Sequence, residues 1–254
     1  MRDVLNISAY RFVTLQDAQD LRERLHAHAQ ALNLKGTVLL AEEGINLFLA
    51  GPADAVREWV RELRQDPRFA PIEPKESWSE EVPFKKLLVK VKGEIIRMNH
   101  PAIRPDALGD EGRAPAVSPD TLKRWLTQGH DDEGRPVVTL DTRNAFEVDY
   151  GTFDNAIDWR IDKFSEFPEQ VLAHRDEFKG KTVVSFCTGG IRCEKAALVM
   201  SEAGIDHVYQ LDGGILKYLE LTDGTHWHGE CFVFDGRESV DNGLEPGQGP
   251  SRRA

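Results

Sequence analysis

The sequence predicts an α/β protein with two domains. In residues 1–104, apolar strand-like runs and amphipathic helical stretches follow one another in the order βαββαβ, with one extra strand. In the second half, short β-branched runs alternate with helical patterns, which is typical of a doubly wound parallel sheet. Between these halves, residues 105–116 ("PDALGDEGRAPA") lack periodicity and are rich in Pro, Gly and Asp, so we interpret them as a linker.

The element order of the first domain, residues 1–104, is typical of a ferredoxin-like (acylphosphatase-like) α+β sandwich. Its first helix carries Ala18, Leu21, Leu25 and Leu32 at helical spacing. Its second helix has a proline near the first turn. We expect strands over residues 5–13, 36–41, 44–51, 72–78 and 85–92, and helices over residues 15–33 and 52–66.

The second domain is expected over residues 117–222. It opens with a helix whose N-cap is Ser118, with Pro119 at the first helical position. Ligands bind at the carboxyl ends of strands in such sheets, and Asp141 and Cys187 fall at these ends. The C-terminal segment 223–254 has few apolar residues from about 235 onward, so we expect disorder there. Further strands are expected over residues 136–141 and 181–186, and helices over residues 118–128, 167–178 and 192–204.

Composition places the chain among globular proteins of a reducing compartment. Hydrophobic residues make up 40% of the 254 residues, and the mean hydropathy is −0.45. No apolar run reaches the ~18 residues of a membrane span, and the start lacks the apolar core of a secretory signal. Three cysteines cannot form a disulfide framework. We therefore expect a cytoplasmic protein without a membrane partner.

The net charge of −11 is unevenly spread, because residues 1–104 are nearly neutral and the acidic excess lies in the remainder. The stretch 82–104 carries six basic residues and one acid, Glu94. Local potential decides recognition, so an anionic partner is compatible with this sequence. Two interpretations remain open for these cations, namely the solvent side of a strand or a contact with RNA.

The stretch "SFCTGGIRCEKA" carries the chemistry. Cys187 follows a strand, and a helix begins near Arg192. Gly189 and Gly190 permit backbone conformations that point successive amide N–H groups inward. The helix N-terminus and Arg192 add positive potential, which stabilises a thiolate and lowers its pKa. We therefore predict that Cys187 is a nucleophile.

Two other cysteines and two histidines have less specific signals. Cys193 can pack in the first turn of the helix, which we favour, or resolve an oxidised Cys187 as a disulfide. Cys231 is predicted to be structural. "HWHGEC" places His226 and His228 near Cys231, but no fourth ligand is evident, so we predict no metal site. No glycine-rich nucleotide fingerprint stands out, and no cofactor is evident.

Three segments, in order, resemble the signatures of a rhodanese domain over about residues 117–222: "LDTRNAFEVDYGTFDNAI", "VVSFCTGGIRCEKA" and "YQLDGGILKYL". Asp141, Arg143, Glu147 and Gly151 match the first signature, and Gly213 and Gly214 match the last. Cys187 matches the sulfur-carrying cysteine, which implies that it could carry a persulfide. The rest of the six-residue loop is matched by Thr188, Gly189, Gly190, Ile191 and Arg192.

A more specific resemblance extends across both halves of the chain. "GTVLLAEEGINLFLAG", "KESWSEEVPFKKLLVKVKGEII", "CTGGIRCEKA" and "GECFVFDGR" are similar to the rhodanese-related tRNA uridine-34 hydroxylases. The resemblance implies an oxidoreductase that converts the wobble uridine of tRNA to 5-hydroxyuridine, with molecular oxygen as co-substrate. It also implies tRNA as a partner, contacted in the anticodon region, and either a sulfur donor or a reductant. We expect the RNA-binding side chains to be Lys85, Lys86, Lys90, Lys92 and Arg97.

Alternative functions remain open. Cys187 could carry a persulfide as a plain sulfurtransferase, or the domain could be a non-catalytic rhodanese-like binding module. The Cys-x4-Arg spacing is one residue shorter than the phosphate-wrapping loop of cysteine phosphatases, which disfavours that class. We expect Asp141, Arg143 and Cys193 to support the loop, with Asp141 and Arg143 forming a buried pair at a strand end.

Overall fold

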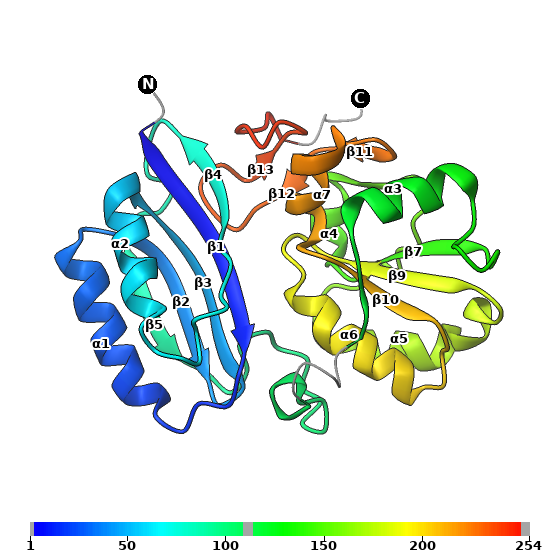
Figure 1. Cartoon of the computed structure of the whole chain (residues 1–254), viewed down its shortest axis with the longest axis horizontal. Coiled ribbons are helices and arrows are strands. Elements are labelled where there is room, and N and C mark those ends of the chain that lie inside the picture. The colour runs from blue at the N-terminus through cyan, green and yellow to red at the C-terminus, as the bar shows by residue number, and fades with distance from the viewer. Residues whose placement is uncertain (1–2, 109–113, 250–254) are drawn as a thin grey trace. The chain divides into compact units, whose positions relative to one another are not determined.

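The computed structural model describes residues 3–108 and 114–249 (Figure 1). The chain divides into two compact units. The first unit runs to Arg97 and includes Asp235–Arg237, and the second contains the rest of the chain from Met98. None of the helices in the described part of the chain is long and apolar enough to span a bilayer.

The first unit is one five-stranded sheet with two helices. Its strand order is β4-β1-β3-β2-β5, in which β5 pairs in parallel with β2 and the other neighbours are antiparallel. The four strands other than β5 have the order of a ferredoxin-like sheet, which confirms the predicted α+β fold, and β5 is the extra strand. The elements are β1 (Val4–Phe12), α1 (Ala18–Ala31), β2 (Lys35–Ala41), β3 (Gly44–Pro52), α2 (Ala53–Leu63), β4 (Lys75–Ser79) and β5 (Leu87–Val91).

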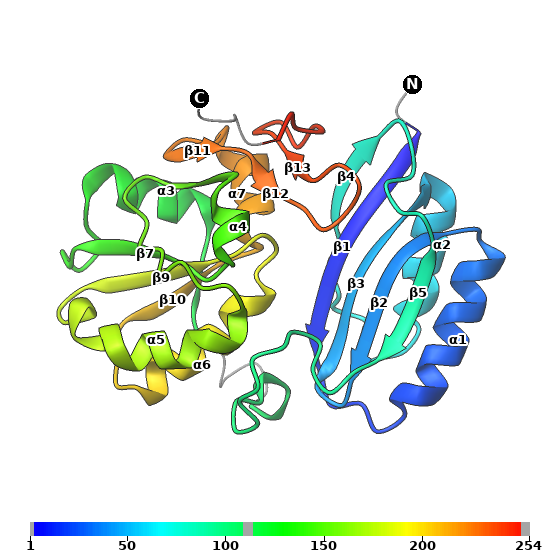
Figure 2. The same ribbon diagram turned by 180° about the vertical axis from the view of Figure 1, so that it is seen from behind.

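Alternation along the strands explains the core of the first unit. The helices α1 and α2 lie on the same face of the sheet (Figures 1 and 2). Ile7, Leu47 and Val38 point to that face and pack in one cluster with Leu25 of α1 and Trp59 of α2. The indole Nε1 of Trp59 donates to the Leu25 carbonyl at 3.3 Å, so the two helices are joined by a buried hydrogen bond.

The second unit contains a four-stranded parallel sheet of order β6-β10-β9-β7. Helices α3 and α7 lie on one face and α5 and α6 on the other (Figure 1), which confirms the doubly wound α/β domain. The elements are β6 (Ala116–Val117), α3 (Pro119–Gln128), β7 (Val137–Asp141), α4 (Ala145–Val148), β8 (Gly151–Phe153), α5 (Phe167–His174), β9 (Thr182–Phe186), α6 (Ile191–Glu202), β10 (Val208–Leu211), α7 (Gly214–Thr222), β11 (Trp227–Gly229), β12 (Cys231–Phe232) and β13 (Ser239–Val240).

Local sequence signals set several boundaries of the second unit. The Ser118 hydroxyl accepts from the Thr121 amide at 3.2 Å, and Pro119 is the first residue of α3, as predicted. The helix ends at Gln128, and its C-cap Gly129 has a φ of 81°, in the left-handed region. Asp141 is the last residue of β7, and Cys187 follows the last residue of β9, so both lie at strand carboxyl ends.

The C-terminal segment differs from our expectation. We expected disorder from about residue 235, but up to residue 249 the chain forms strand β13 and hydrogen-bonded turns. Val240 is buried among core residues of the second unit. The Glu230 carboxylate accepts hydrogen bonds from the Ser239 hydroxyl and from the amides of Gln248 and Gly249. The buried Val240 and these hydrogen bonds hold the segment in place, and composition alone could not reveal either.

The predicted linker, residues 105–116, is only partly without structure. It begins with a 3-10 turn at Pro105–Ala107 and ends in β6, while residues 109–113 lie outside the described part of the chain. The boundary between the two units lies between Arg97 and Met98, which is before the predicted linker.

Candidate active site

The candidate site is the turn between β9 and α6. Cys187 is 1% exposed and follows the buried strand, and α6 begins at Ile191. Gly190 has a φ of 100°, which L side chains rarely adopt, and its amide donates to the Cys187 Sγ at 3.2 Å. The Arg192 amide also favours the thiolate form of this sulfur. The turn is therefore an amide nest around Cys187.

Helix α7 holds the other side of the same turn. The Ile215 amide donates to the Cys187 carbonyl at 3.0 Å, and the Leu216 amide donates to the Thr188 carbonyl at 3.1 Å. A Cβ at Gly214 would lie 2.5 Å from the Cys187 carbonyl oxygen, so only glycine allows this approach. By contrast, a Cβ at Gly189 would meet nothing within 4 Å. The turn is thus fixed from one side and open at Gly189.

Arg192 does not act as a free cation. Its Nη1 and Nη2 donate to the two carboxylate oxygens of Glu147 at 3.0 and 2.8 Å, and both side chains are buried. Glu147 also caps α4, because its carboxylate accepts from the Asn144 amide at 3.1 Å. The Arg192 Nε is buried without a hydrogen-bond partner among the residues that the structure describes. One guanidinium donor is therefore left for a ligand.

Asp141 and Arg143 form the predicted buried pair. The Arg143 Nε and Nη2 donate to Asp141 at 2.9 and 2.6 Å, and neither side chain is exposed. Arg143 also donates to the carbonyls of Glu147 and Gly151 at 3.3 and 2.6 Å, and Thr152 donates to Asp141 at 2.9 Å. The pair therefore joins the end of β7 to α4 and β8. Because the Asp141 carboxylate and the Arg143 guanidinium are both engaged in these hydrogen bonds, the contacts fit a structural role for the pair.

The electrostatics of the turn favour a thiolate. Burial raises the pKa of Cys187, but the Cys193 thiol, the Arg192 charge and the amides of Arg192 and Gly190 outweigh burial. The resulting pKa of Cys187 is lowered to about 6. Burial raises the pKa of Cys193 well above its usual value, and the adjacent Cys187 raises it further. Cys187 is therefore the thiolate of the pair, and Cys193 stays protonated.

Cys193 lies in the same turn as Cys187, because its amide donates to the Gly190 carbonyl at 3.0 Å, and its thiol lowers the pKa of Cys187. It is 0% exposed, and its Sγ lies 3.9 Å from the Thr142 hydroxyl. Cys231, also 0% exposed, belongs to β12 in the core of the second unit. Burial raises its pKa to about 12, despite the nearby Arg143 charge.

The side chains of His226, His228 and Cys231 do not come together in one site. His226 Nδ1 lies 3.3 Å from an Asp154 oxygen, and His228 contacts the other oxygen of that carboxylate. Cys231 is buried in the core cluster. Within residues 3–108 and 114–249, no three or more His, Cys, Asp or Glu side chains are grouped to hold a metal ion.

The predicted RNA-binding cations belong to the first unit. Strand β5 pairs with β2 from Leu87 to Val91, and the Lys92 amide continues this ladder to the Leu40 carbonyl. Val89 faces the helices, so Lys86, Lys90 and Lys92 share the opposite face by alternation. All five predicted side chains are exposed: Lys85, Lys86, Lys90, Lys92 and Arg97.

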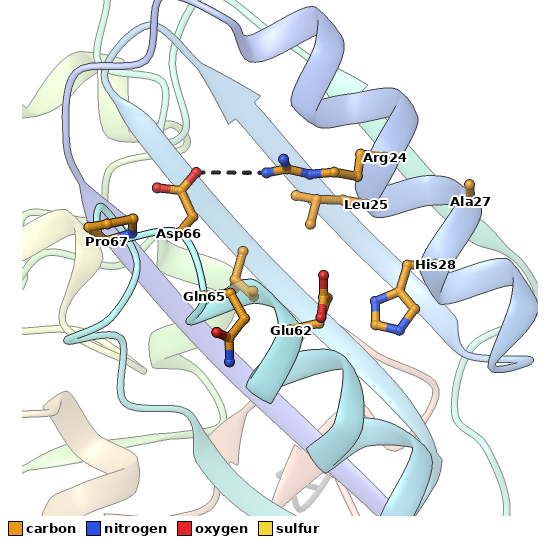
Figure 3. A pocket seen from close by; sticks show the side chains of 9 residues that line it. Arg24, Leu25, Ala27, His28, Glu62, Gln65, Asp66 and Pro67 are labelled. Carbon is orange, nitrogen blue, oxygen red and sulfur yellow. Dashed lines mark ion pairs between the residues drawn. The ribbon is translucent and has the colours of Figure 1, made fainter.

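A cavity of about 730 Å³ lies between α1 and α2 of the first unit (Figure 3). Arg24 and Asp66 form an ion pair of 3.7 Å across it, and Glu62 and His28 also line it. None of the side chains predicted from the sequence to form a site contributes to its lining.

Comparisons with known proteins identify the family. Residues 4–95 match the model of the UPF0176 acylphosphatase like domain, and residues 118–221 match that of the rhodanese-like domain. The tRNA uridine(34) hydroxylase of Delftia acidovorans is 66% identical over 94% of this chain and 90% of its own length. The chain belongs to the tRNA uridine(34) hydroxylase family. Another member, from Bordetella petrii, is 63% identical over 97% of this chain and 96% of its own length.

A solved rhodanese-like domain from Anabaena is similar at 20% identity and a TM-score of 0.36, over 45% of this chain and 79% of that one. The membership in the tRNA uridine(34) hydroxylase family confirms the resemblance drawn from the sequence. The rhodanese resemblance included Glu147, but the sequence did not reveal that its carboxylate pairs with Arg192. The spacing from Asn144 to Glu147 is a capping-box signal. Sequence reasoning also did not assign the α7 amides of Ile215 and Leu216.

Proposed function

We propose that this protein hydroxylates carbon 5 of uridine 34 in tRNA, using molecular oxygen and Cys187. The observation that carries the proposal is a thiolate-stabilising nest at Cys187 in a chain whose relatives at 63–66% identity are named tRNA uridine(34) hydroxylases. Hydroxylation at this position gives 5-hydroxyuridine in the anticodon. The protein acts in the cytoplasm, where its tRNA substrate is found.

The first chemical step is covalent activation of the base. Carbon 5 of uracil becomes electron-rich when a nucleophile adds to carbon 6, and the Cys187 thiolate is suited to that addition. The negative charge that develops is shared between carbon 5 and oxygen 4. Arg192 Nε, which has no partner among the described residues, is the donor available to stabilise this charge. The base approaches past Gly189, where the turn is open.

The overall reaction needs two electrons beyond those of the base. Oxygen adds to carbon 5, one oxygen atom remains as the hydroxyl group, and the other leaves as water. The balance is met by two thiols: uridine, dioxygen and two thiols give 5-hydroxyuridine, one disulfide and water. The reductant is thus a dithiol, and loss of the carbon 5 proton expels Cys187 and restores the aromatic base.

Binding of the anticodon region is assigned to cations of the first unit. These exposed cations are Lys85, Lys86, Lys90, Lys92 and Arg97. Contacts between such side chains and RNA phosphates supply an affinity that falls as the salt concentration rises. The second half of the chain carries the acidic excess, so the cations near β5 are the better candidates for this role.

The test incubates the reduced protein with unmodified tRNA and isotopically labelled dioxygen, and then analyses nucleoside 34 by mass spectrometry. We expect 5-hydroxyuridine whose hydroxyl oxygen comes from dioxygen, and none with Cys187→Ser. A thiolated uridine would favour the sulfurtransferase, and label from water rather than dioxygen would contradict the oxygen-dependent route.

A further inference from the structure

Four aromatic rings form a cluster at the edge of the candidate site. Phe232 is at its centre, with its ring centroid 5.2 Å from Phe146, 5.1 Å from Tyr150 and 5.0 Å from Phe234. All three contacts are edge-to-face. Phe146 is 46% exposed and Phe234 is 45% exposed, and both exceed the exposure expected of rings placed for core packing. We refer to Phe146, Tyr150, Phe232 and Phe234 as the aromatic cluster.

The aromatic cluster is fixed to the cysteine turn. The Thr188 hydroxyl, next to Cys187, donates to the Phe232 carbonyl at 3.3 Å. The Arg192 guanidinium lies over the Phe234 ring at 5.8 Å from its centroid. Phe146 precedes Glu147, the carboxylate that holds Arg192. The exposed rings therefore border the turn that carries the nucleophile.

The charges around the aromatic cluster disfavour phosphate binding there. The Tyr150 hydroxyl donates to Glu238 at 3.5 Å, Arg160 pairs with Asp149 at 2.8 Å, and Arg192 pairs with Glu147. A surface of exposed rings with neutralised cations suits the faces of nucleobases, because stacking does not require charge.

We infer that the aromatic cluster is a stacking platform for the unpaired bases that flank uridine 34 in the anticodon loop. This inference rests on the proposed function, since it takes the wobble uridine as the base presented to Cys187. Stacking on Phe146 and Phe234 holds the neighbouring bases at the edge of the turn while uridine 34 enters past Gly189. Recognition by stacking tolerates any base at the flanking positions.

The test measures the affinity of the full chain for an anticodon stem-loop. Replacing Phe146 and Phe234 together by Ala should weaken binding by about tenfold or more, as loss of base stacking does in other proteins that bind single strands. Phe→Trp at either position should preserve binding, and stem-loop addition should quench the new tryptophan. The matched control replaces Leu172 and Leu221 by Ala, since these side chains of the same unit are 61% and 51% exposed.

Two further measurements separate the possible outcomes. The rate of Cys187 alkylation by a small reagent should be unchanged in the double Phe variant, which shows that the turn is intact. Unchanged stem-loop affinity, or an equal loss in the leucine control, overturns the platform. If the protein yields no 5-hydroxyuridine while the Phe variant still loses affinity specifically, the platform stands and the proposed reaction fails.

A separate observation concerns the two neighbouring thiols. Both cysteines are held by Gly190, whose amide donates to the Cys187 Sγ at 3.2 Å and whose carbonyl accepts from the Cys193 amide at 3.0 Å. They are 1% and 0% exposed. The reaction proposed above consumes two thiols for each hydroxylated base. We propose that Cys187 and Cys193 are themselves the dithiol that supplies these two electrons, an assignment that also rests on the proposed function.

The steps balance within the site. After Cys187 adds to carbon 6, carbon 5 bonds to dioxygen and a proton completes the hydroperoxide. The Cys193 sulfur attacks the terminal oxygen, so the O–O bond breaks, the hydroxyl remains on carbon 5 and Cys193 becomes a sulfenic acid. Loss of the carbon 5 proton expels the Cys187 thiolate. That thiolate attacks Cys193, which releases water and leaves a Cys187–Cys193 disulfide for an external thiol to reduce.

A single-turnover experiment tests this assignment. Protein reduced beforehand and freed of reductant should make about one 5-hydroxyuridine per chain and then stop. Cleavage after Arg192 and Lys195 puts the two cysteines on different tryptic peptides, so the disulfide should appear as a linked peptide pair. Cys193→Ser should lose this first turnover, whereas Cys231→Ser, the matched control, should keep it.

Two results would overturn the dithiol. One is a full first turnover by Cys193→Ser without added thiol, while the wild type is active. The other is the absence of the linked peptide pair after the native protein is treated with diamide, which needs no tRNA. Absence of product with an intact linked pair would instead count against the hydroxylation, not against the redox pair.

Discussion

Two opposing effects set the pKa of the Cys187 thiol. Burial favours the neutral thiol, whereas Cys193, Arg192 and two amides favour the thiolate. The thiolate is the reactive form, so alkylation should accelerate as the pH rises through about 6 and level off above it. A free thiol would titrate near ~8.5. The measurement is the rate of iodoacetamide labelling at Cys187 against pH. Cys193→Ala removes a donor and should move the midpoint upward, whereas a midpoint near ~8.5 in the wild type would contradict the nest.

The same shift has a consequence for stability. Because the pKa of Cys187 is lower in the folded chain than in the unfolded one, the thiolate stabilises the fold fully above the unfolded pKa. That stabilisation is lost as the pH falls through the folded pKa of about 6. The difference in unfolding free energy between the wild type and Cys187→Ala should therefore grow with pH over this window.

Asp141 and Arg143 form an ion pair in which both side chains are fully buried, and we predict that Asp141 supports the site through Arg143. Asp141→Ala should destabilise the fold by about 3–5 kcal/mol, because it leaves a buried guanidinium without its counter-charge. Activity should fall together with the melting temperature in thermal unfolding. Asp132→Ala removes an exposed carboxylate paired with Arg124 and should have little effect on either. An inactive Asp141→Ala with an unchanged melting temperature would point to direct chemistry instead.

At the scale of elements, the N-terminus of α7 determines the shape of the cysteine turn. Gly214→Ala should disturb it, because the new Cβ would lie 2.5 Å from the Cys187 carbonyl oxygen. Gly180→Ala is a matched control, since its φ of 70° is close to the 67° of Gly214 but its Cβ would meet nothing within 4 Å. Both variants carry a left-handed strain of about 1–2 kcal/mol. Only Gly214→Ala should change the alkylation rate of Cys187, and equal effects would refute the contact.

The second prediction at the scale of elements concerns the lysines on and beside strand β5. Lys86, Lys90 and Lys92 share the face opposite the helices, so replacing all three by Glu should weaken tRNA binding for every sequence. The slope of log affinity against log salt should become shallower by about 0.7–0.9 for each phosphate that the variant no longer neutralises. The control reverses Arg24, Arg57 and Arg61, which are exposed on α1 and α2 and change the net charge equally. An equal loss of affinity in the control would indicate a general charge effect rather than a site.

At the scale of the whole molecule, the second unit extends beyond the rhodanese signatures. The buried cluster that contains Phe186 and Tyr218 also includes side chains from beyond residue 222, namely Trp227, Cys231, Val233 and Val240. A chain that ends at residue 222 should therefore lose the cooperative unfolding transition of this unit in calorimetry. A chain that ends at residue 249 should keep it. An unchanged transition in the shorter chain would show that the last strands are dispensable.

The sequence alone determined the features that depend on neighbouring residues. The strand and helix periods, the cap at Ser118, the order βαββαβ and the Cys–Thr–Gly–Gly turn were all predictable, because residues a few positions apart fix them. The Asp141–Arg143 pair was predictable for the same reason, since the partners are two residues apart. The local nature of these interactions is why the doubly wound fold and the amide turn around Cys187 could be predicted.

Only the tertiary structure decided which distant side chains meet around Cys187. Glu147 and Arg192 are 45 residues apart, and nothing in the local pattern indicated that this carboxylate neutralises the arginine that was expected to act as a free charge. The aromatic cluster joins α4 to β12, and the α7 amides of Ile215 and Leu216 hold the turn from a third element. Such contacts depend on how the sheet orders its strands and on how the helices cross it, so they are properties of the assembled domain and not of any single segment.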